Sequence, residues 1–159
     1  MSESLKRVVA ALADAGLDVS PLELGPETRT ALQAADAAGC ALDQIAKSVI
    51  LAGTESGAAI LFVTAGGNQV DVGKASKAAG EPLGKADAAL IRAQTGFAIG
   101  GVAPIGHLSP ISAFFDPRLL DFDVIYAAAG TPRHIFPIDP HTLQRISKAQ
   151  VTDFTTDSK

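Results

Sequence analysis

The chain has 159 residues, with 13 Lys and Arg against 17 Asp and Glu, so its net charge is −4, and 47% of its residues are hydrophobic. This composition excludes a predominantly disordered chain and predicts one globular domain of ordinary size. The acidic balance argues against a protein that coats nucleic acid through bulk positive charge, while it leaves room for a local basic site.

The cysteine content and the apolar runs bear on the cellular setting. Cys40 is the single cysteine and cannot form an internal disulfide. Apolar runs such as 49–52 and 124–129 are far shorter than the roughly 20 residues that cross a bilayer. No early stretch combines a basic start with a long apolar run. We therefore expect a cytoplasmic protein that does not bind a membrane.

The first forty residues predict two helices and a short strand. Apolar residues recur at helical spacing over 5–12, ahead of a glycine, which predicts a first helix. Residues 17–24 include a proline, so a strand here cannot be central in a sheet. Thr28 or Thr30 can cap a second helix over 31–38, which a glycine ends.

The middle of the chain predicts a hairpin and two further helices. Two runs rich in apolar and β-branched residues, 45–52 and 58–64, flank a short loop, which is typical of a β-hairpin. Asp71 can cap a helix that continues to residue 79, and another short helix is expected over 86–94.

The second half of the chain predicts a loop followed by strands. Glycine and proline are frequent from 97 to 110, so this stretch is expected to be a shaped loop. Strands are expected at 111–115 and 122–128, separated by one helical turn that a proline opens. A last strand near 134–138 leads into a helix over about 140–148.

Helical and strand patterns intermix along the whole sequence and do not segregate into halves. This predicts a single α/β (α+β) domain over 1–150 with a mainly antiparallel or mixed sheet. Residues 151–159 are polar and are expected to form a frayed C-terminal tail.

Lys47 is the first candidate for a functional residue. Strand alternation places it in a row that is otherwise apolar, with Ile45 and Val49 as neighbours on the same face. A lysine in that row either extends to water at the end of the strand or meets an anion in a pocket. Both interpretations remain open from the residues alone, and the second predicts an anion or phosphate site.

The stretch 96–107 is the second candidate. Its glycines and Pro104 permit left-handed backbone angles and a close approach of backbone N–H groups to a ligand. Such donors could hold a carbonyl oxygen or its developing oxyanion, while an ordinary structural loop is the competing interpretation. The glycine spacing matches neither a dinucleotide fingerprint nor a Walker loop.

The remaining polar residues predict no metal or cofactor. The three histidines fall at spacings that match no metal motif, and the lone cysteine has no partner for a zinc site. Ser109 and Ser112 lie near His107, but no Gly-x-Ser-x-Gly elbow accompanies them. The residues therefore supply neither a nucleophile nor a ligand set.

Five segments, taken in order and spacing, resemble one protein family. The segments are Arg29-Thr30 with the helix to Gly39, Gln44–Ser48, Gln69–Asp71, Thr95–His107 and Ile125–Gly130. Over about Pro26 to Leu143 the chain is similar to the YbaK/ProX family of free-standing aminoacyl-tRNA deacylases. That family is related to the editing domain inserted in bacterial prolyl-tRNA synthetases.

The resemblance implies a fold and an activity. The fold is a curved, mixed β-sheet with flanking helices, and the activity is hydrolysis of the ester bond between a wrong amino acid and its tRNA. The lysine matching Lys47 contacts the phosphate of the terminal adenosine, and the loop matching Gly100–Pro104 surrounds the aminoacyl group. A hydroxyl of the substrate's own terminal ribose helps to activate water. An activated ester held in this way needs few catalytic side chains.

The resemblance also assigns roles to individual positions of this sequence. It implies catalytic roles for Lys47, Gly100 and Gly101. It implies substrate contacts from Thr30, Ser48, Val102, Ala103, Pro104, Gly106, His107, Ala128 and Gly130. The partners implied are the acceptor end of an aminoacyl-tRNA and an aminoacyl-tRNA synthetase.

The chain departs from the family near the expected substrate. Some members have aromatic residues at the positions of 28–30, some have a hydroxyl residue in place of Ala128, and Thr131-Pro132-Arg133 replaces a frequent Arg-Gly. These positions bear on the size and polarity of the pocket. A small amino acid such as alanine, serine or cysteine is the expected substrate, with tRNA for proline as one candidate, since a pocket excludes larger side chains sterically.

Two other classes of function are compatible with the sequence. One is a non-catalytic module that binds tRNA or a synthetase, and the other is a hydrolase of a different small acyl ester. DNA binding is disfavoured by the charge of −4 and by the lack of a recognition helix. Lys47 together with the Gly100–Pro104 loop favours the enzyme, because a scaffold has no chemical need for an anion site facing a donor-rich loop.

Overall fold

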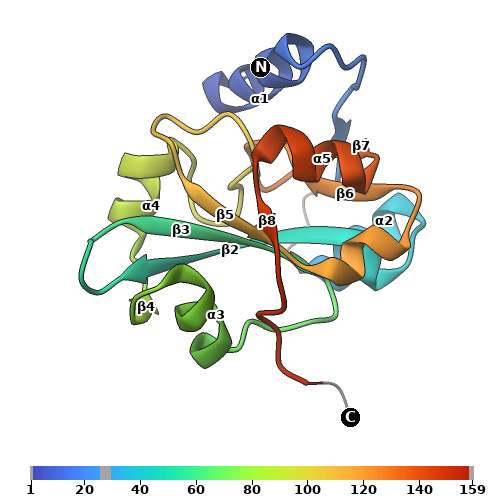
Figure 1. Ribbon diagram of the computed structural model, residues 1–159. Coiled ribbons are helices and arrows are strands. Elements are labelled where there is room, and N and C mark those ends of the chain that lie inside the picture. Colours follow the sequence, from blue (N-terminus) through green and yellow to red (C-terminus); the bar gives the residue numbers. More distant parts are fainter. Residues whose placement is uncertain (1, 26–29, 158–159) are drawn as a thin grey trace.

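The computed structural model describes residues 2–25 and 30–157, which form an eight-stranded mixed sheet with five α-helices around it (Figure 1). The helices and strands, in chain order, are α1 (Glu3–Asp14), β1 (Leu22–Glu23), α2 (Ala31–Ala38), β2 (Ile45–Gly53), β3 (Ala59–Ala65), α3 (Val72–Ala79), β4 (Leu83–Lys85), α4 (Ala88–Thr95), β5 (Ser112–Phe115), β6 (Ile125–Ala128), β7 (His134–Ile138), α5 (Pro140–Ser147) and β8 (Gln150–Val151). Two 3₁₀ turns, Leu42–Gln44 and Pro117–Asp121, precede β2 and follow β5.

The sheet has the strand order β1-β7-β6-β2-β3-β5-β8, and β4 pairs with β2 outside this path. The pairs β2–β6, β3–β5 and β5–β8 are parallel, and the pairs β1–β7, β6–β7, β2–β3 and β2–β4 are antiparallel. The prediction of a mixed sheet in a single α/β domain is confirmed.

One edge of β2 is interrupted. Its first edge pairs with β3 continuously over residues 46–52. Its other edge pairs with β6 at Ile45 and Ala46 and then with β4 from Leu51 to Gly53. Among the described residues no strand pairs with this edge over 47–50. The sheet is therefore open at the part of β2 where Lys47 lies.

Helices cover both faces of the sheet. On one face, α1, α4 and α5 pack with the loop that follows α4 into the main core, whose largest fully buried side chains include Phe97, Phe115 and Phe136. On the other face, α3 packs on β3 through Ala75 and Phe62. In Figure 1, α1 and α5 lie above the sheet and α3 lies below it. β3 is central, so all seven of its residues are buried.

The local sequence signals for helices are confirmed. Thr30 caps α2 by accepting a hydrogen bond from the Gln33 amide at 3.1 Å, and Gly39 ends the helix in the left-handed conformation. Asp71 caps α3, as expected. Thr28, the alternative cap, lies outside the described residues.

Two elements differ from the expectation. β4 was not anticipated, and α4 begins two residues later than expected because Asp87 is its cap.

The expectation of a frayed end is wrong for residues 151–157. β8 pairs with β5, and Phe154 is completely buried against Phe62. The Lys74 ammonium donates hydrogen bonds to Asp153, Asp157 and the Thr155 carbonyl at 2.8–3.1 Å. The buried Phe154, the Lys74 contacts and backbone hydrogen bonds to Gln69 and Asp71 therefore order a segment whose composition is mostly polar. None of the described helices is both long and apolar enough to span a membrane.

Candidate active site

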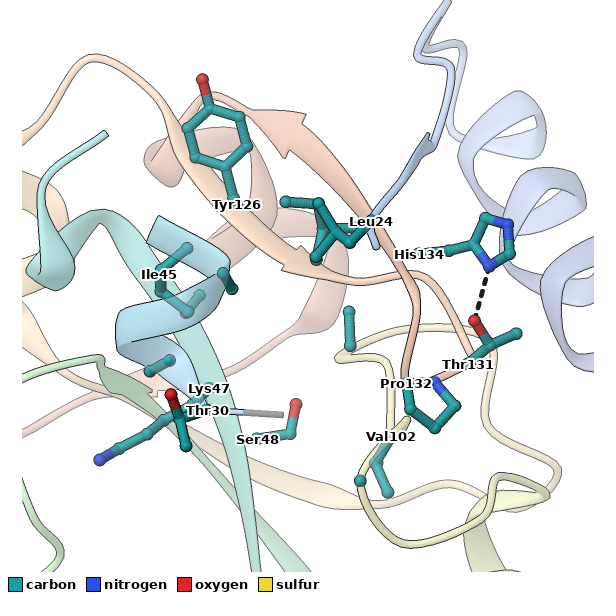
Figure 2. Close-up of a pocket in the computed structure, with 16 residues that line it drawn as sticks. Leu24, Thr30, Ile45, Lys47, Ser48, Val102, Tyr126, Thr131, Pro132 and His134 are labelled. Carbon is teal, nitrogen blue, oxygen red and sulfur yellow. Dashed lines mark hydrogen bonds between the residues drawn. The ribbon is translucent and has the colours of Figure 1, made fainter. Parts of the chain in front are cut away.

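A cavity of about 300 Å³ opens at the interruption in β2. Its walls come from α2, β2, β6, the start of β7, the loop after α4 and the turn between β6 and β7 (Figure 2). The lining residues are Leu24, Thr30, Ala31, Ala34, Ile45, Ala46, Lys47, Ser48, Gly100, Val102, Tyr126, Ala128, Thr131, Pro132, His134 and Ile135. Segments about 100 residues apart in the sequence thus meet around one space.

The predicted site residues divide into two groups. Six of them line this cavity, namely Thr30, Lys47, Ser48, Gly100, Val102 and Ala128. The other six are not among its lining residues, namely Gly101, Ala103, Pro104, Gly106, His107 and Gly130. Most of this second group is buried in the body of the glycine-rich loop and of the β6–β7 turn, behind the wall. They shape the cavity from outside it.

Lys47 is partly buried, and a backbone carbonyl is its hydrogen-bond acceptor. Its Nζ donates a hydrogen bond to the Gly66 carbonyl oxygen at 3.3 Å, and it forms no ion pair within the part of the chain that the structure describes. Burial lowers the pKa of Lys47, while the charges of Asp43 and Asp116 oppose this by raising it. A desolvated ammonium without a counterion is suited to bind an anion.

The turn that follows β3 positions the lysine. Asp116 is 2% exposed, and its Oδ2 accepts a hydrogen bond from Asn68 Nδ2 at 2.9 Å. Asp43 Oδ1 accepts from the Gly67 amide at 2.8 Å. The two carboxylates hold the turn through these bonds, and the neighbouring Gly66 carbonyl is the acceptor for Lys47. The carboxylates therefore act on the lysine through the turn and through their charge, without a direct ion pair.

Ser48 extends from β2 in the opposite direction to Lys47 (Figure 2). Its Oγ is buried and has no hydrogen-bond partner among the residues that the structure describes. A buried hydroxyl without a partner costs free energy. Ser48 therefore contributes to the cavity lining a residue whose hydroxyl is unsatisfied among the described residues.

The glycines of the 100–106 loop serve two different purposes. Gly100 has a φ of +90°, in the left-handed region that side chains avoid, and it begins the part of the loop that lines the cavity. Gly101 has an ordinary φ, but a Cβ there would lie only 2.8 Å from the Thr131 carbonyl carbon and 3.0 Å from the Pro132 nitrogen. Its lack of a side chain lets the loop pack directly against the β6–β7 turn.

His107 contributes to the loop's internal structure. Its Nε2 hydrogen-bonds the Ala103 carbonyl oxygen at 2.7 Å, and its ring meets Phe97 edge-on. Burial is the main cause that lowers the pKa of His107; the Ala103 hydrogen bond opposes it and the Arg7 charge adds to it. The imidazole is therefore held neutral and bonded within the loop, away from the cavity lining.

Sequence analysis named Ala128, Thr131 and Pro132 as positions that bear on the pocket, but it missed Tyr126, His134 and Ile135, which the β6–β7 hairpin also brings to the cavity. Thr131 Oγ1 and His134 Nδ1 share a hydrogen bond of 2.6 Å at the cavity wall (Figure 2). Tyr126 and Ile135 complete the wall beside them. The alternation of strand 125–128 could have indicated Tyr126, since it shares a face with Ala128. No cluster of side chains suited to hold a metal occurs in residues 2–25 or 30–157.

Comparison with known proteins agrees with this arrangement. A model of the aminoacyl-tRNA editing domain matches residues 25–146. The chain belongs to this family. The match confirms the resemblance to the YbaK-type editing proteins that the five sequence segments indicated. It begins after α1 and β1, so α1 lies outside the matched region of this editing domain.

Individual relatives extend over most of the chain. "Uncharacterized protein YwhH" from Bacillus subtilis (strain 168) is 30% identical over 129 residues, 81% of this chain and 82% of that protein. A crystal structure named "a putative trans-editing enzyme for prolyl tRNA synthetase" is 41% identical, with a TM-score of 0.92 over 99% of both chains. The crystal structure of "hypothetical protein APE2540" is 25% identical, with a TM-score of 0.85 over 94% of this chain and 99% of that one.

Proposed function

We propose that this editing domain is a trans-acting deacylase that hydrolyses the ester bond of a mischarged aminoacyl-tRNA. The observation that supports the proposal is that Lys47, Ser48 and the Gly100 loop line one cavity, although they come from separate segments. The partly buried ammonium of Lys47, the Ser48 hydroxyl and the loop at Gly100 together match the needs of an aminoacyl-adenosine end. That end has a phosphate, a positively charged amino group and an ester carbonyl.

Lys47 binds the phosphate of the terminal nucleotide in this proposal. The partly desolvated ammonium has one hydrogen bond to Gly66 and two further N–H donors for an anion. Gly100 and Val102 line the cavity, and in this proposal their backbone N–H groups hold the ester carbonyl as negative charge develops on its oxygen. A hydroxyl of the substrate's terminal ribose activates the attacking water, as the family resemblance implies.

The substrate is a small amino acid in this proposal, with alanine, serine and cysteine as the candidates. The cavity of about 300 Å³ lies at the small end of ligand sites, and Tyr126, Ile135 and Leu24 narrow it. Larger side chains are excluded sterically, whereas smaller apolar ones are not rejected strongly. The cavity therefore excludes the correct amino acid because that amino acid is larger than these candidates.

The tRNA for proline is the first substrate to test, and prolyl-tRNA synthetase is the first candidate partner. Both choices follow from the name of the solved structure that is 41% identical to this chain. The domain acts in the cytoplasm in this proposal, where aminoacyl-tRNA is made and used. Because the chain has a net charge of −4, tRNA binds in this proposal through a local contact at its acceptor end, and this binding is weak and salt-sensitive.

The experiment is a deacylation assay on a panel of aminoacyl-tRNAs. It includes alanyl-, seryl- and cysteinyl-tRNA of the proline type, with correctly charged prolyl-tRNA as the control. We expect rapid loss of one mischarged species. Binding of tRNA without hydrolysis would overturn the proposal in favour of a non-catalytic module. Hydrolysis of small acyl esters alone would favour a different esterase.

A pair of lysine variants connects the activity to this cavity. Lys47→Ala is expected to abolish deacylation with the fold intact, because it removes the ammonium and keeps the apolar strand. Lys77→Ala removes an equal charge from α3, away from the cavity lining, and is expected to be active. Circular dichroism and thermal unfolding establish that both variants fold.

A further inference from the structure

Arg7 of α1 connects the two ends of the glycine-rich loop. Its Nε donates a hydrogen bond of 2.8 Å to the carbonyl oxygen of Gly106, where the loop ends. Its Nη2 lies 3.5 Å from the carbonyl oxygen of Thr95, where α4 ends and the loop begins. The guanidinium also lies over the Phe97 ring, with Cζ 4.4 Å from the ring centroid. One side chain thus contacts the loop at its start, at its core aromatic residue and at its end.

The surrounding residues leave space for this contact. Gly96, which ends α4, has no side chain, and a Cβ there would lie 2.5 Å from Arg7 Nη2. The buried side of α1, formed by Leu5, Val8 and Leu12, packs in the same core as the loop residues. α1 therefore presents Arg7 to the loop from a fixed position.

α1 also supports the second loop of the cavity. A Cβ at Gly130 would lie 2.7 Å from the Ser4 carbonyl oxygen, so the turn between β6 and β7 lies directly against the start of α1. The next residues of that turn, Thr131 and Pro132, line the cavity and contact Gly101. Both loops that form this wall therefore rest on a helix outside the matched editing-domain region.

We infer that Arg7 is a positioning residue for deacylation, which holds the Gly100–Gly106 loop in its working geometry from outside the cavity. The inference rests on the proposed function. A planar guanidinium can bond two carbonyl oxygens and stack on a ring at once, whereas a lysine ammonium offers a point charge. Arg7 itself does not line the cavity, so it acts on the substrate through the loop.

The inference predicts an effect on the chemical step. Without Arg7 the loop keeps the backbone hydrogen bonds from Leu108 to Thr95 and from Ser109 to Gln94. It loses the side chain that contacts Thr95, Phe97 and Gly106 together. A displacement of the ester-binding wall by about 1 Å lowers kcat by roughly 10- to 100-fold. KM changes less, because Lys47 on β2 is untouched and still binds the phosphate.

The test compares Arg7→Ala with Lys6→Ala, which removes an equal charge from the exposed side of the same helix. We expect Arg7→Ala to lose kcat with little change in KM and to recover activity when guanidinium ion is added at a non-denaturing concentration. Lys6→Ala is expected to match the unmodified protein. Unchanged kcat in a folded Arg7→Ala protein would overturn the inference, as would recovery with ammonium as good as with guanidinium.

Hydrogen exchange provides a measurement that does not depend on activity. Amides of residues 97–107 are expected to exchange faster in Arg7→Ala, while those of β2 and β3 keep their rates. If no tRNA is hydrolysed by the unmodified protein, the proposed function fails, and loop exchange still decides whether Arg7 holds the loop. If Arg7→Ala does not fold, Arg7→Lys takes its place. It keeps the charge and most of the stem, and unchanged kcat and loop exchange in Arg7→Lys would overturn the inference.

Discussion

Replacing Gly101 by alanine tests whether the close packing of two loops sets the geometry of the cavity. The added Cβ would lie 2.8 Å from the Thr131 carbonyl carbon, 2.9 Å from its Cα and 3.0 Å from the Pro132 nitrogen. Ordinary carbon contacts are about 3.5–4.0 Å, so the loops must separate by roughly 0.7 Å or more. All three contacts are with backbone, so no side-chain rotation can relieve them.

The size of the effect follows from that displacement. Overpacking of this kind costs about 1–3 kcal/mol of unfolding free energy. Each kcal/mol lowers the Tm of a domain of this size by about 2–4 °C. A shift approaching 1 Å in the wall around the ester lowers deacylation by up to roughly 100-fold. Because Gly101 has an ordinary φ, none of this loss comes from backbone strain at the substituted residue.

The assay measures thermal unfolding and single-turnover deacylation on the same protein. Gly84→Ala is the matched control, since its Cβ would meet only the Thr54 Cγ2 at 3.5 Å, an ordinary contact away from the cavity. We expect Gly84→Ala to keep both stability and rate. A Gly101→Ala protein with the stability and rate of the unmodified chain would refute the reasoning, because the two loops would then tolerate separation.

Three further predictions concern charge and the C-terminal segment. Burial lowers the pKa of Lys47, so deacylation is expected to decline at a pH below 10.5, where the lysine loses its proton. In a pH–rate profile, Lys47→Arg is expected to move this decline to higher pH. The free energy of unfolding is expected to fall as the pH drops below 6.5, because the pKa of His107 is lowered in the folded protein and the unfolded chain then binds more protons than the folded one. In urea titrations, His107→Gln is expected to reduce this dependence on pH. Phe154→Ala is expected to cost about 3–5 kcal/mol in the same titrations, and a loss under 1 kcal/mol would show that the segment does not stabilise the fold.

Much of the fold could be predicted because its signals are local. Helix α2 is determined by Thr30 before it and Gly39 after it, and both residues act within a few positions of the chain. The β2–β3 hairpin follows from two apolar runs around a short loop. Such features need no knowledge of distant segments, so the sequence indicates them to within one or two residues.

The C-terminal segment could not be predicted from its composition. It is mostly polar, but Phe154 fills a space between Phe62 and α3 that forms only when the sheet is assembled. Lys74 stabilises the segment from 79 residues away in the sequence. A single apolar residue in a polar stretch gives no periodicity, so its burial depends wholly on tertiary structure.

Only part of the candidate site could be predicted, because some of its residues are unusual in the local sequence and others come together only in the fold. Lys47 and Gly100 were found because an ammonium in an apolar row and a glycine-rich stretch are unusual in themselves. His134 and Ile135 were missed because only the pairing of β6 with β7 brings them to the cavity. The support from Arg7 was equally hidden, since it acts on the loop 99 residues later in the chain.

The interruption in β2 explains how one cavity can use neighbouring residues of a strand. Lys47 and Ser48 point to opposite faces of the sheet, so an unbroken sheet would separate them. Because β6 leaves β2 after Ala46 and β4 joins it only at Leu51, the space between these partners connects both faces. Under the proposed function, Lys47 then binds the phosphate on one face of the sheet, and Ser48 contacts the aminoacyl group on the other. A substitution at Ser48 can therefore change which amino acid is removed while the Lys47 contact with the tRNA end is retained.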